Sequence, residues 1–161
     1  MGKGYELKCN RCGFSREICD GIGFCYPMEC ETLLEKMKKG SFGKGFMEAA
    51  KRMPCAAVHQ NRTIFLCDHC GAWRADASID LCAPVGEREV RKGKFCTAFD
   101  YPDDIRYVMS YDIGCNYQIV RSKQHRCGKC HYKMRLIKEK EKLKCPQCGT
   151  HLIKCNEFDW D

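Results

Sequence analysis

The chain has 161 residues, of which 30% are charged, and its formal net charge is +7. This length suits one domain or two small ones. No run of about 18 apolar residues is present, which excludes an ordinary membrane-spanning helix. The first residues, MGKGYELKC, lack the apolar run of a secretory signal peptide, so we expect a cytoplasmic protein.

Cysteine is the unusual feature of the composition, with 16 in 161 residues. A reducing cytoplasm disfavours disulfides, and clustered cysteines in such a compartment usually bind metal. Eight of them form four C-x-x-C pairs: Cys9/Cys12, Cys67/Cys70, Cys127/Cys130 and Cys145/Cys148. Two intervening residues let the chain turn so that both sulfurs face one point.

The first predicted element is a hairpin around Cys9 and Cys12, because YELKCNRCGFSREIC has alternating apolar positions on both sides of the pair. The residue after the second cysteine is glycine in three pairs and histidine in the other: Gly13, Gly71, Gly149 and His131. Glycine tolerates the left-handed backbone that such a tight turn needs.

Residues 27–53 are predicted to form a helical hairpin. Apolar residues recur at helical spacing in two runs: Cys30, Leu33, Leu34 and Met37, then Phe42, Phe46, Ala49, Ala50 and Met53. Pro27 can open the first helix, Gly40 can end it, and Pro54 ends the second.

The next predicted element is a second hairpin, in which TIFLCDHCGAWRADASIDL alternates apolar and polar residues around Cys67 and Cys70. Although 54 residues separate Cys12 from Cys67, two such hairpins side by side can share one ion. We therefore predict a first zinc site of Cys9, Cys12, Cys67 and Cys70, in a domain over residues 1–82 that the helical hairpin interrupts.

Residues 83–120 are predicted to connect two modules. The segment APVGEREVRKGKF is polar and loop-like, whereas IRYVMSYDI and YQIV indicate strands. Aromatic residues gather here, and we expect them to form core between the modules: Phe95, Phe99, Tyr101, Tyr107, Tyr111 and Tyr117.

The C-terminal domain, residues 121–161, is predicted to hold the second zinc. Fourteen residues lie between Cys130 and Cys145, just under the usual window for two C-x-x-C pairs that share an ion. The intervening HYKMRLIKEKEKLK is typical of a strand, a charged turn and a returning strand. The predicted ligands are Cys127, Cys130, Cys145 and Cys148.

Residues 121–144 are strongly basic, with ten Lys and Arg against two Glu. The cations are Arg121, Lys123, Arg126, Lys129, Lys133, Arg135, Lys138, Lys140, Lys142 and Lys144. Two Zn²⁺ would add four positive charges and eight thiolates would remove eight, which lowers the total from +7 to +3. The local stripe is therefore better evidence than the total charge for contact with phosphates, and a protein partner is the other candidate.

Several alternatives stay open at this point. Four thiolates also fit a rubredoxin-like iron, and disulfides or a redox C-x-x-C motif are weaker options. Crossed pairing, in which Cys9 and Cys12 join Cys145 and Cys148, is a further alternative. We expect His69 and His131 to be neighbours of the ligands, since four thiolates already complete a shell.

The remaining cysteines form no further C-x-x-C pair, and we expect them to be buried thiols that pack as small apolar groups. They are Cys19, Cys25, Cys30, Cys55, Cys82, Cys96, Cys115 and Cys155. An enzyme that uses a free thiol such as Cys25 or Cys115 is a weak hypothesis, because neither has a histidine nearby in the sequence.

The segments CGKC and KCPQCG resemble the knuckle pair of zinc-ribbon and rubredoxin-like proteins. The whole chain resembles small bacterial double zinc-ribbon proteins through ELKCNRCGF, GIGFCYP, CDHCGAW, CGKC, CPQCG and the terminal Trp160-Asp161. The resemblance is thin between residues 83 and 120, and it implies two ribbons and metal binding but no activity.

The sequence therefore predicts a small α+β metal-binding protein with two zinc ribbons made of short antiparallel hairpins. We expect two structural Zn²⁺ ions, no enzymatic activity, and a role as a protein or nucleic-acid interaction module. A rubredoxin-like iron electron carrier is the alternative function.

Overall fold

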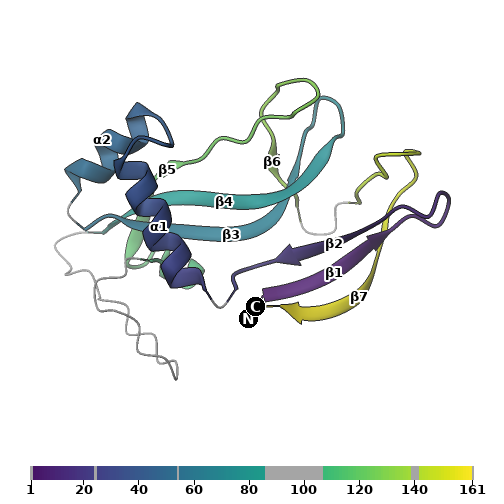
Figure 1. Cartoon of the computed structure of the whole chain (residues 1–161), viewed down its shortest axis with the longest axis horizontal. Helices are drawn as coiled ribbons and strands as arrows, with labels where there is room; N and C mark the ends of the chain where they lie inside the picture. The colour runs from purple at the N-terminus through teal and green to yellow at the C-terminus, as the bar shows by residue number, and fades with distance from the viewer. Residues whose placement is uncertain (1, 24, 54, 86–106, 139–141, 161) are drawn as a thin grey trace. The chain divides into compact units, whose positions relative to one another are not determined.

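The computed structural model describes residues 2–23, 25–53, 55–85, 107–138 and 142–160 (Figure 1). The strands are β1 (Gly2–Lys8), β2 (Ser15–Asp20), β3 (Ala57–Leu66), β4 (Trp73–Pro84), β5 (Tyr117–Ser122), β6 (Arg135–Leu136) and β7 (Ile153–Trp160). The helices are α1 (Tyr26–Lys38), α2 (Lys44–Arg52) and the 3-10 helix η1 (Ser110–Asp112). Within the described ranges, none of these helices has the length and apolarity to cross a bilayer.

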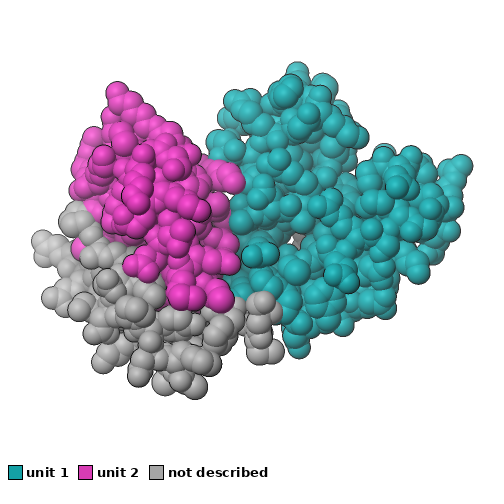
Figure 2. All heavy atoms as spheres, viewed as in Figure 1, with its two compact units in different colours: residues 1–23, 61–77, 124–161 teal, residues 24–60, 78–123 magenta. Residues whose placement is uncertain are grey.

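The chain divides into two compact units that alternate along the sequence (Figure 2). Unit 1 comprises residues 1–23, 61–77 and 124–161, and unit 2 comprises residues 24–60 and 78–123. This division differs from the consecutive domains 1–82, 83–120 and 121–161 that the sequence predicted. The difference arises because strands from distant segments pair with one another.

A three-stranded antiparallel sheet in unit 1 has the order β2-β1-β7 (Figure 1). The hairpin predicted around Cys9 and Cys12 is confirmed, with Lys8 opposite Ser15. β1 also pairs with β7, so the first and last strands of the chain are neighbours. The unit has an apolar core whose buried members are Leu7, Cys9, Ile18, Ile64, Leu143, Cys145 and Leu152.

A four-stranded sheet has the order β5-β4-β3-β6. β3 and β4 flank the Cys67/Cys70 turn as predicted, and each contributes residues to both units. The strand expected at YQIV is confirmed as part of β5. The strand expected over 105–113 is wrong for Ser110–Asp112, which forms η1. The Asp112 N–H donates to the Met109 carbonyl, and the Asn116 N–H donates to the Asp112 carbonyl, so the chain turns here.

The helices form as the apolar spacing predicted. Pro27 lies in the first turn of α1, and Gly40, at φ 90°, follows its end. The residues that α1 buries are Tyr26, Pro27, Cys30, Leu34 and Met37. Both helices belong to unit 2, whereas the sequence placed them as an insert within the first predicted domain, residues 1–82. Of the predicted aromatic cluster, Phe95, Phe99 and Tyr101 lie outside the described residues; Tyr107 and Tyr117 are buried and Tyr111 is exposed.

Candidate metal centres

All four C-x-x-C pairs build the same turn. The N–H of the first cysteine donates to the carbonyl five residues later, as from Cys9 to Phe14. The N–H of the residue after the second cysteine donates back to the first, as from Gly13 to Cys9. These eight hydrogen bonds measure 2.7–3.1 Å between N and O. The turns are therefore set by local bonds, which explains why the sequence identified all of them.

The residue after the second cysteine has a left-handed backbone in each turn. Its φ is 72° at Gly13, 70° at Gly71, 75° at Gly149 and 59° at His131. This confirms the predicted use of glycine at three positions. At His131 the same geometry is held by a residue with a Cβ, at a steric cost of about 1–2 kcal/mol.

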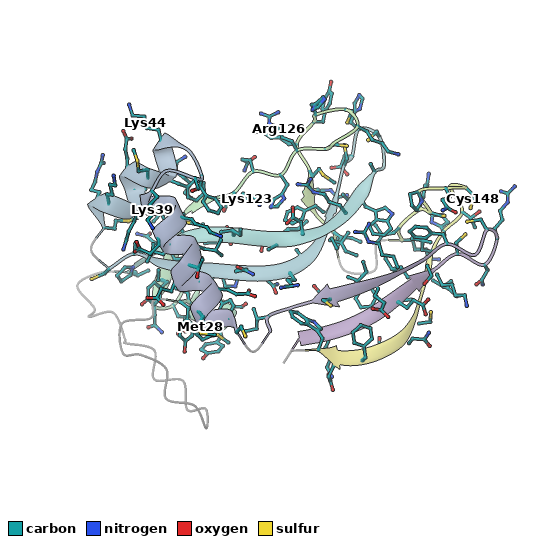
Figure 3. The ribbon with its side chains drawn as sticks, viewed as in Figure 1. Met28, Lys39, Lys44, Lys123, Arg126 and Cys148 are labelled. Atoms are coloured by element: carbon teal, nitrogen blue, oxygen red, sulfur yellow. The ribbon has the colours of Figure 1, made fainter. Side chains whose placement is uncertain are left out.

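The eight sulfurs gather into two groups of four. The terminal site consists of Cys9, Cys12, Cys145 and Cys148, and the internal site consists of Cys67, Cys70, Cys127 and Cys130. Within each group all four Sγ atoms lie within 4.8 Å of one another. Figure 3 shows Cys148 at the end of the β1–β2 hairpin.

The sulfur spacing fits a tetrahedral metal shell and excludes disulfides. Cys9 and Cys148 have their Sγ atoms 3.5 Å apart, as do Cys67 and Cys130. A disulfide requires about 2.05 Å. Four Zn–S bonds of about 2.3 Å in a tetrahedron place the sulfurs about 3.8 Å apart. Both groups could therefore hold a metal ion.

The predicted partition of the cysteines between two sites is wrong, and the crossed alternative is the one observed. The sequence predicted that the Cys9/Cys12 pair would share an ion with the Cys67/Cys70 pair. It also predicted that the Cys127/Cys130 pair would share an ion with the Cys145/Cys148 pair. In the structure the Cys9/Cys12 pair instead meets the Cys145/Cys148 pair. The other two pairs, Cys67/Cys70 and Cys127/Cys130, form the second group. All four ligands of the internal site therefore lie between Cys12 and Cys145 in the sequence, so the internal site is nested within the terminal site.

Strand pairing explains the nesting. At the terminal site Lys8, just before the first ligand, lies opposite Ile153 in β7. At the internal site Leu66, in the same position before its first ligand, lies opposite Arg135 in β6. Ile153 and Arg135 are each the fifth residue after the last ligand of their site, so both sites are built in one register.

The thiols differ in burial and in ionisation. The first cysteine of every pair is buried, and the second is exposed or half-buried. Backbone N–H donors at Cys130 and Lys129 lower the pKa of Cys127 to about 6. At Cys130 a backbone N–H from Tyr132 acts in the same direction, but burial and the neighbouring thiols outweigh it and raise the pKa to about 12. Metal binding must therefore expel protons, which makes affinity rise with pH.

The surroundings of the internal site are polar and aromatic. His69 stacks on Tyr132 with ring centroids 4.0 Å apart, and Arg135 bonds to the Asp68 carboxylate. Neither His69 nor His131 belongs to the two ligand groups, as expected. The sequence prediction missed His125, which is buried and stacks on the Phe65 ring. Its position two residues before the ligand Cys127 was the signal that could have identified it.

The remaining thiols only partly match the expectation of burial. Cys30 and Cys82 are buried, and burial raises the pKa of each to about 12. Cys25 and Cys115 are exposed, which is contrary to the prediction. Cys19, Cys55 and Cys155 are half-buried, and Cys96 lies outside the described residues.

Comparisons of the chain with family models, with curated proteins and with solved structures found no match in any of the three.

Proposed function

We propose that the protein binds two Zn²⁺ ions as structural metals, one at the terminal site and one at the internal site, and that unit 1 is a double zinc-ribbon module. The convergence of eight sulfurs into two four-membered groups carries this proposal. Zinc with four thiolate ligands has no open position for water or substrate. The metal sites are therefore assigned no catalytic role.

The zinc ions would stabilise the fold of unit 1 directly. Two ligands of the terminal site, Cys9 and Cys145, are members of the buried core together with Leu7 and Leu152. Removing the ion would leave these thiolates close together in an apolar surround, where their mutual repulsion is weakly screened. Metal binding and folding are coupled in small domains of this kind.

We further propose that the face around the internal site contacts a nucleic acid. Arg126, Lys129 and Lys133 are exposed there, in or beside the turn that carries Cys127 and Cys130. Figure 3 labels Arg126. Tyr132 is 58% exposed and stacks on His69, so an aromatic surface lies among these cations. Cations neutralise phosphates without reading sequence, and aromatic rings stack on unpaired bases. This combination favours single-stranded DNA or RNA.

Elemental analysis of protein purified without added metal tests the zinc assignment. We expect about two zinc ions per chain and a colourless protein. Cys12→Ser should lower the zinc content by one, whereas Cys115→Ser, which alters an exposed thiol outside both sites, should leave it unchanged. A red protein with thiolate-to-iron absorption would instead support a rubredoxin-like electron carrier, because the same shell fits iron.

Fluorescence anisotropy with a mixed-sequence single-stranded oligonucleotide, over a series of salt concentrations, tests the partner assignment. Affinity should fall as salt rises, and Lys129→Ala with Lys133→Ala should reduce the slope by about one unit per lost phosphate contact. The matched control is Lys36→Ala, an exposed lysine of α1 in unit 2. Binding that is absent, or insensitive to salt, would remove the nucleic-acid assignment and direct the search to a protein partner.

A further inference from the structure

Unit 2 contains a chain of three polar side chains that the metal sites do not use. His59 Nε2 lies 3.0 Å from Ser110 Oγ, and His59 Nδ1 lies 3.4 Å from Asp80 Oδ2. The three residues are far apart in the sequence, and all of them belong to unit 2. A serine, a histidine and a carboxylate in this order have the connectivity of the acyl-transfer triad.

Three adjacent segments bring the side chains together. His59 lies on β3, and Asp80 lies on the neighbouring strand β4. On the other side of His59, the segment that leads into η1 runs beside β3, since the Val108 N–H donates to the Val58 carbonyl at 3.0 Å. Ser110 is the first residue of η1 and lies two residues after this contact. The backbone of one sheet region therefore fixes all three positions.

The bonding partners determine the histidine tautomer. An ionised carboxylate only accepts hydrogen bonds, so His59 Nδ1 must carry the proton that faces Asp80. In neutral His59 the other nitrogen, Nε2, is then an acceptor, and the Ser110 hydroxyl donates to it. This is the tautomer in which a histidine can take the proton of a serine nucleophile.

The histidine and the carboxylate are shielded from water, whereas the serine lies at the surface. His59 is 7% exposed, and the Asp80 side chain is 14% exposed, so the pair is largely shielded from water. Ser110 is an exposed residue, which places the residue that carries the nucleophile at the surface of unit 2. Shielding strengthens the attraction between Asp80 and an imidazolium formed at His59.

We propose that Ser110, His59 and Asp80 form a hydrolytic site for small carboxylic esters, an activity beyond the metal-binding function. Ser110 Oγ attacks the ester carbonyl carbon while its proton passes to His59 Nε2. The carbonyl carbon–alkoxy oxygen bond then breaks, and His59 returns that proton to the departing alcohol. Water attacks the acyl-serine, its proton passing through His59 to Ser110 Oγ, and the carboxylic acid leaves. Asp80 is the positioning residue that orients His59.

Labelling with a fluorophosphonate probe, followed by peptide mass spectrometry of the zinc-loaded full chain, tests this site. We expect covalent labelling of Ser110 and a parallel loss of p-nitrophenyl acetate hydrolysis. Ser110→Ala should abolish both signals, whereas Ser41→Ala, a change at an exposed serine of the same unit, should affect neither. Ser110→Ala also removes the hydrogen bond to His59 Nε2, which lowers stability, so thermal unfolding of the variant is measured alongside to show that the fold is retained.

The role of the histidine is tested by rate as well as by stability. His59→Gln should slow labelling of Ser110 by about 10²-fold, the usual contribution of a general base. Asp80→Asn should slow labelling with an unchanged zinc content and melting temperature, which a purely structural contact would not do. Unlabelled Ser110 in the wild-type protein, or ester hydrolysis that survives in Ser110→Ala, would overturn the proposal. If His59→Gln does not fold, the Ser110→Ala comparison alone decides.

Discussion

His131 is the one residue that differs from glycine at the position after the second cysteine of the four C-x-x-C turns. The same position is glycine in the other three turns, and φ is positive in all four. The His131 N–H nevertheless makes the same bond to Cys127 that Gly13 makes to Cys9. Hydrogen bonding and the cysteine pair, rather than the residue itself, therefore impose the left-handed conformation here.

This strain gives a prediction about His131. Because a β-branched side chain is worse than histidine at positive φ, His131→Val should destabilise the zinc-loaded protein by about 1–2 kcal/mol. His131→Gly should keep or raise the free energy of unfolding, since relief of strain offsets the greater entropy of glycine in the unfolded chain. Denaturant unfolding at saturating zinc measures both. Equal destabilisation by valine and glycine would show that the imidazole, not the backbone, matters at this position.

At the scale of elements, the contact of β1 with β7 depends on the absence of a side chain at Gly4. A Cβ built at Gly4 would lie 2.1 Å from the Phe158 ring, and one at Gly2 would lie 2.3 Å from the Trp160 ring. The aromatic residues of β7 thus cover the glycines of β1. This packing helps to hold the turns of Cys9 and Cys148 at one site.

We expect Gly4→Ala to displace Phe158 and to destabilise the protein by about 1–3 kcal/mol, the usual cost of overpacking. It should also weaken zinc at the terminal site, because β1 and β7 position that site. Gly128→Ala is the matched control, since a Cβ there meets nothing within 4 Å. Chelator competition and thermal unfolding give the two measurements. An effect of Gly128→Ala as large as that of Gly4→Ala would contradict this account.

Helix α1 connects to the strands of unit 2 through the Tyr26 hydroxyl. It donates to the Val108 carbonyl and accepts from the Gln60 N–H at 3.3 Å. Burial raises the pKa of Tyr26, so the hydroxyl stays protonated at ordinary pH and remains a donor. The phenol therefore joins β3 to the segment that carries Ser110.

Tyr26→Phe should cost about 1–3 kcal/mol, because it leaves a buried carbonyl and a buried N–H without this partner. If Tyr26 also positions Ser110, the rate of fluorophosphonate labelling should fall in the same variant. Tyr111→Phe is the control, since Tyr111 is 70% exposed. Urea unfolding and labelling rates separate the effects, and a variant as stable as the wild type would refute the role given to this hydroxyl.

At the scale of the whole molecule, the nested metal sites predict which strands depend on which ion. Cys148→Ser should remove the terminal zinc and leave the zinc at the internal site, since the two groups share no ligand. Hydrogen exchange should then quicken in β1, β2 and β7, with β6 still protected. Faster exchange around Cys127 and Cys130 instead would support the sequential pairing that the spacing suggested. Cys130→Ser should give the reverse pattern.

The sequence by itself determined the four turns, the helical hairpin and the eight candidate ligands. Each of these depends on interactions between residues at most a few positions apart: the bond from Gly13 to Cys9 and the apolar spacing of α1 are examples. Such patterns can be recognised within a short stretch of sequence, although a helix as short as α1 draws most of its stability from the packing of its apolar face. The residue types that can bind zinc were therefore visible before the fold was known.

Only the tertiary structure decided how the turns combine into sites. Any two C-x-x-C turns can complete a tetrahedral shell, and spacing favoured the sequential pairing. The observed pairing is set by β1 pairing with β7 and β3 pairing with β6. The same holds for His59, Asp80 and Ser110, whose sequence neighbours give no sign of one another. Long-range strand pairing is favourable only when the whole sheet and its core form together, and no local pattern records that free energy.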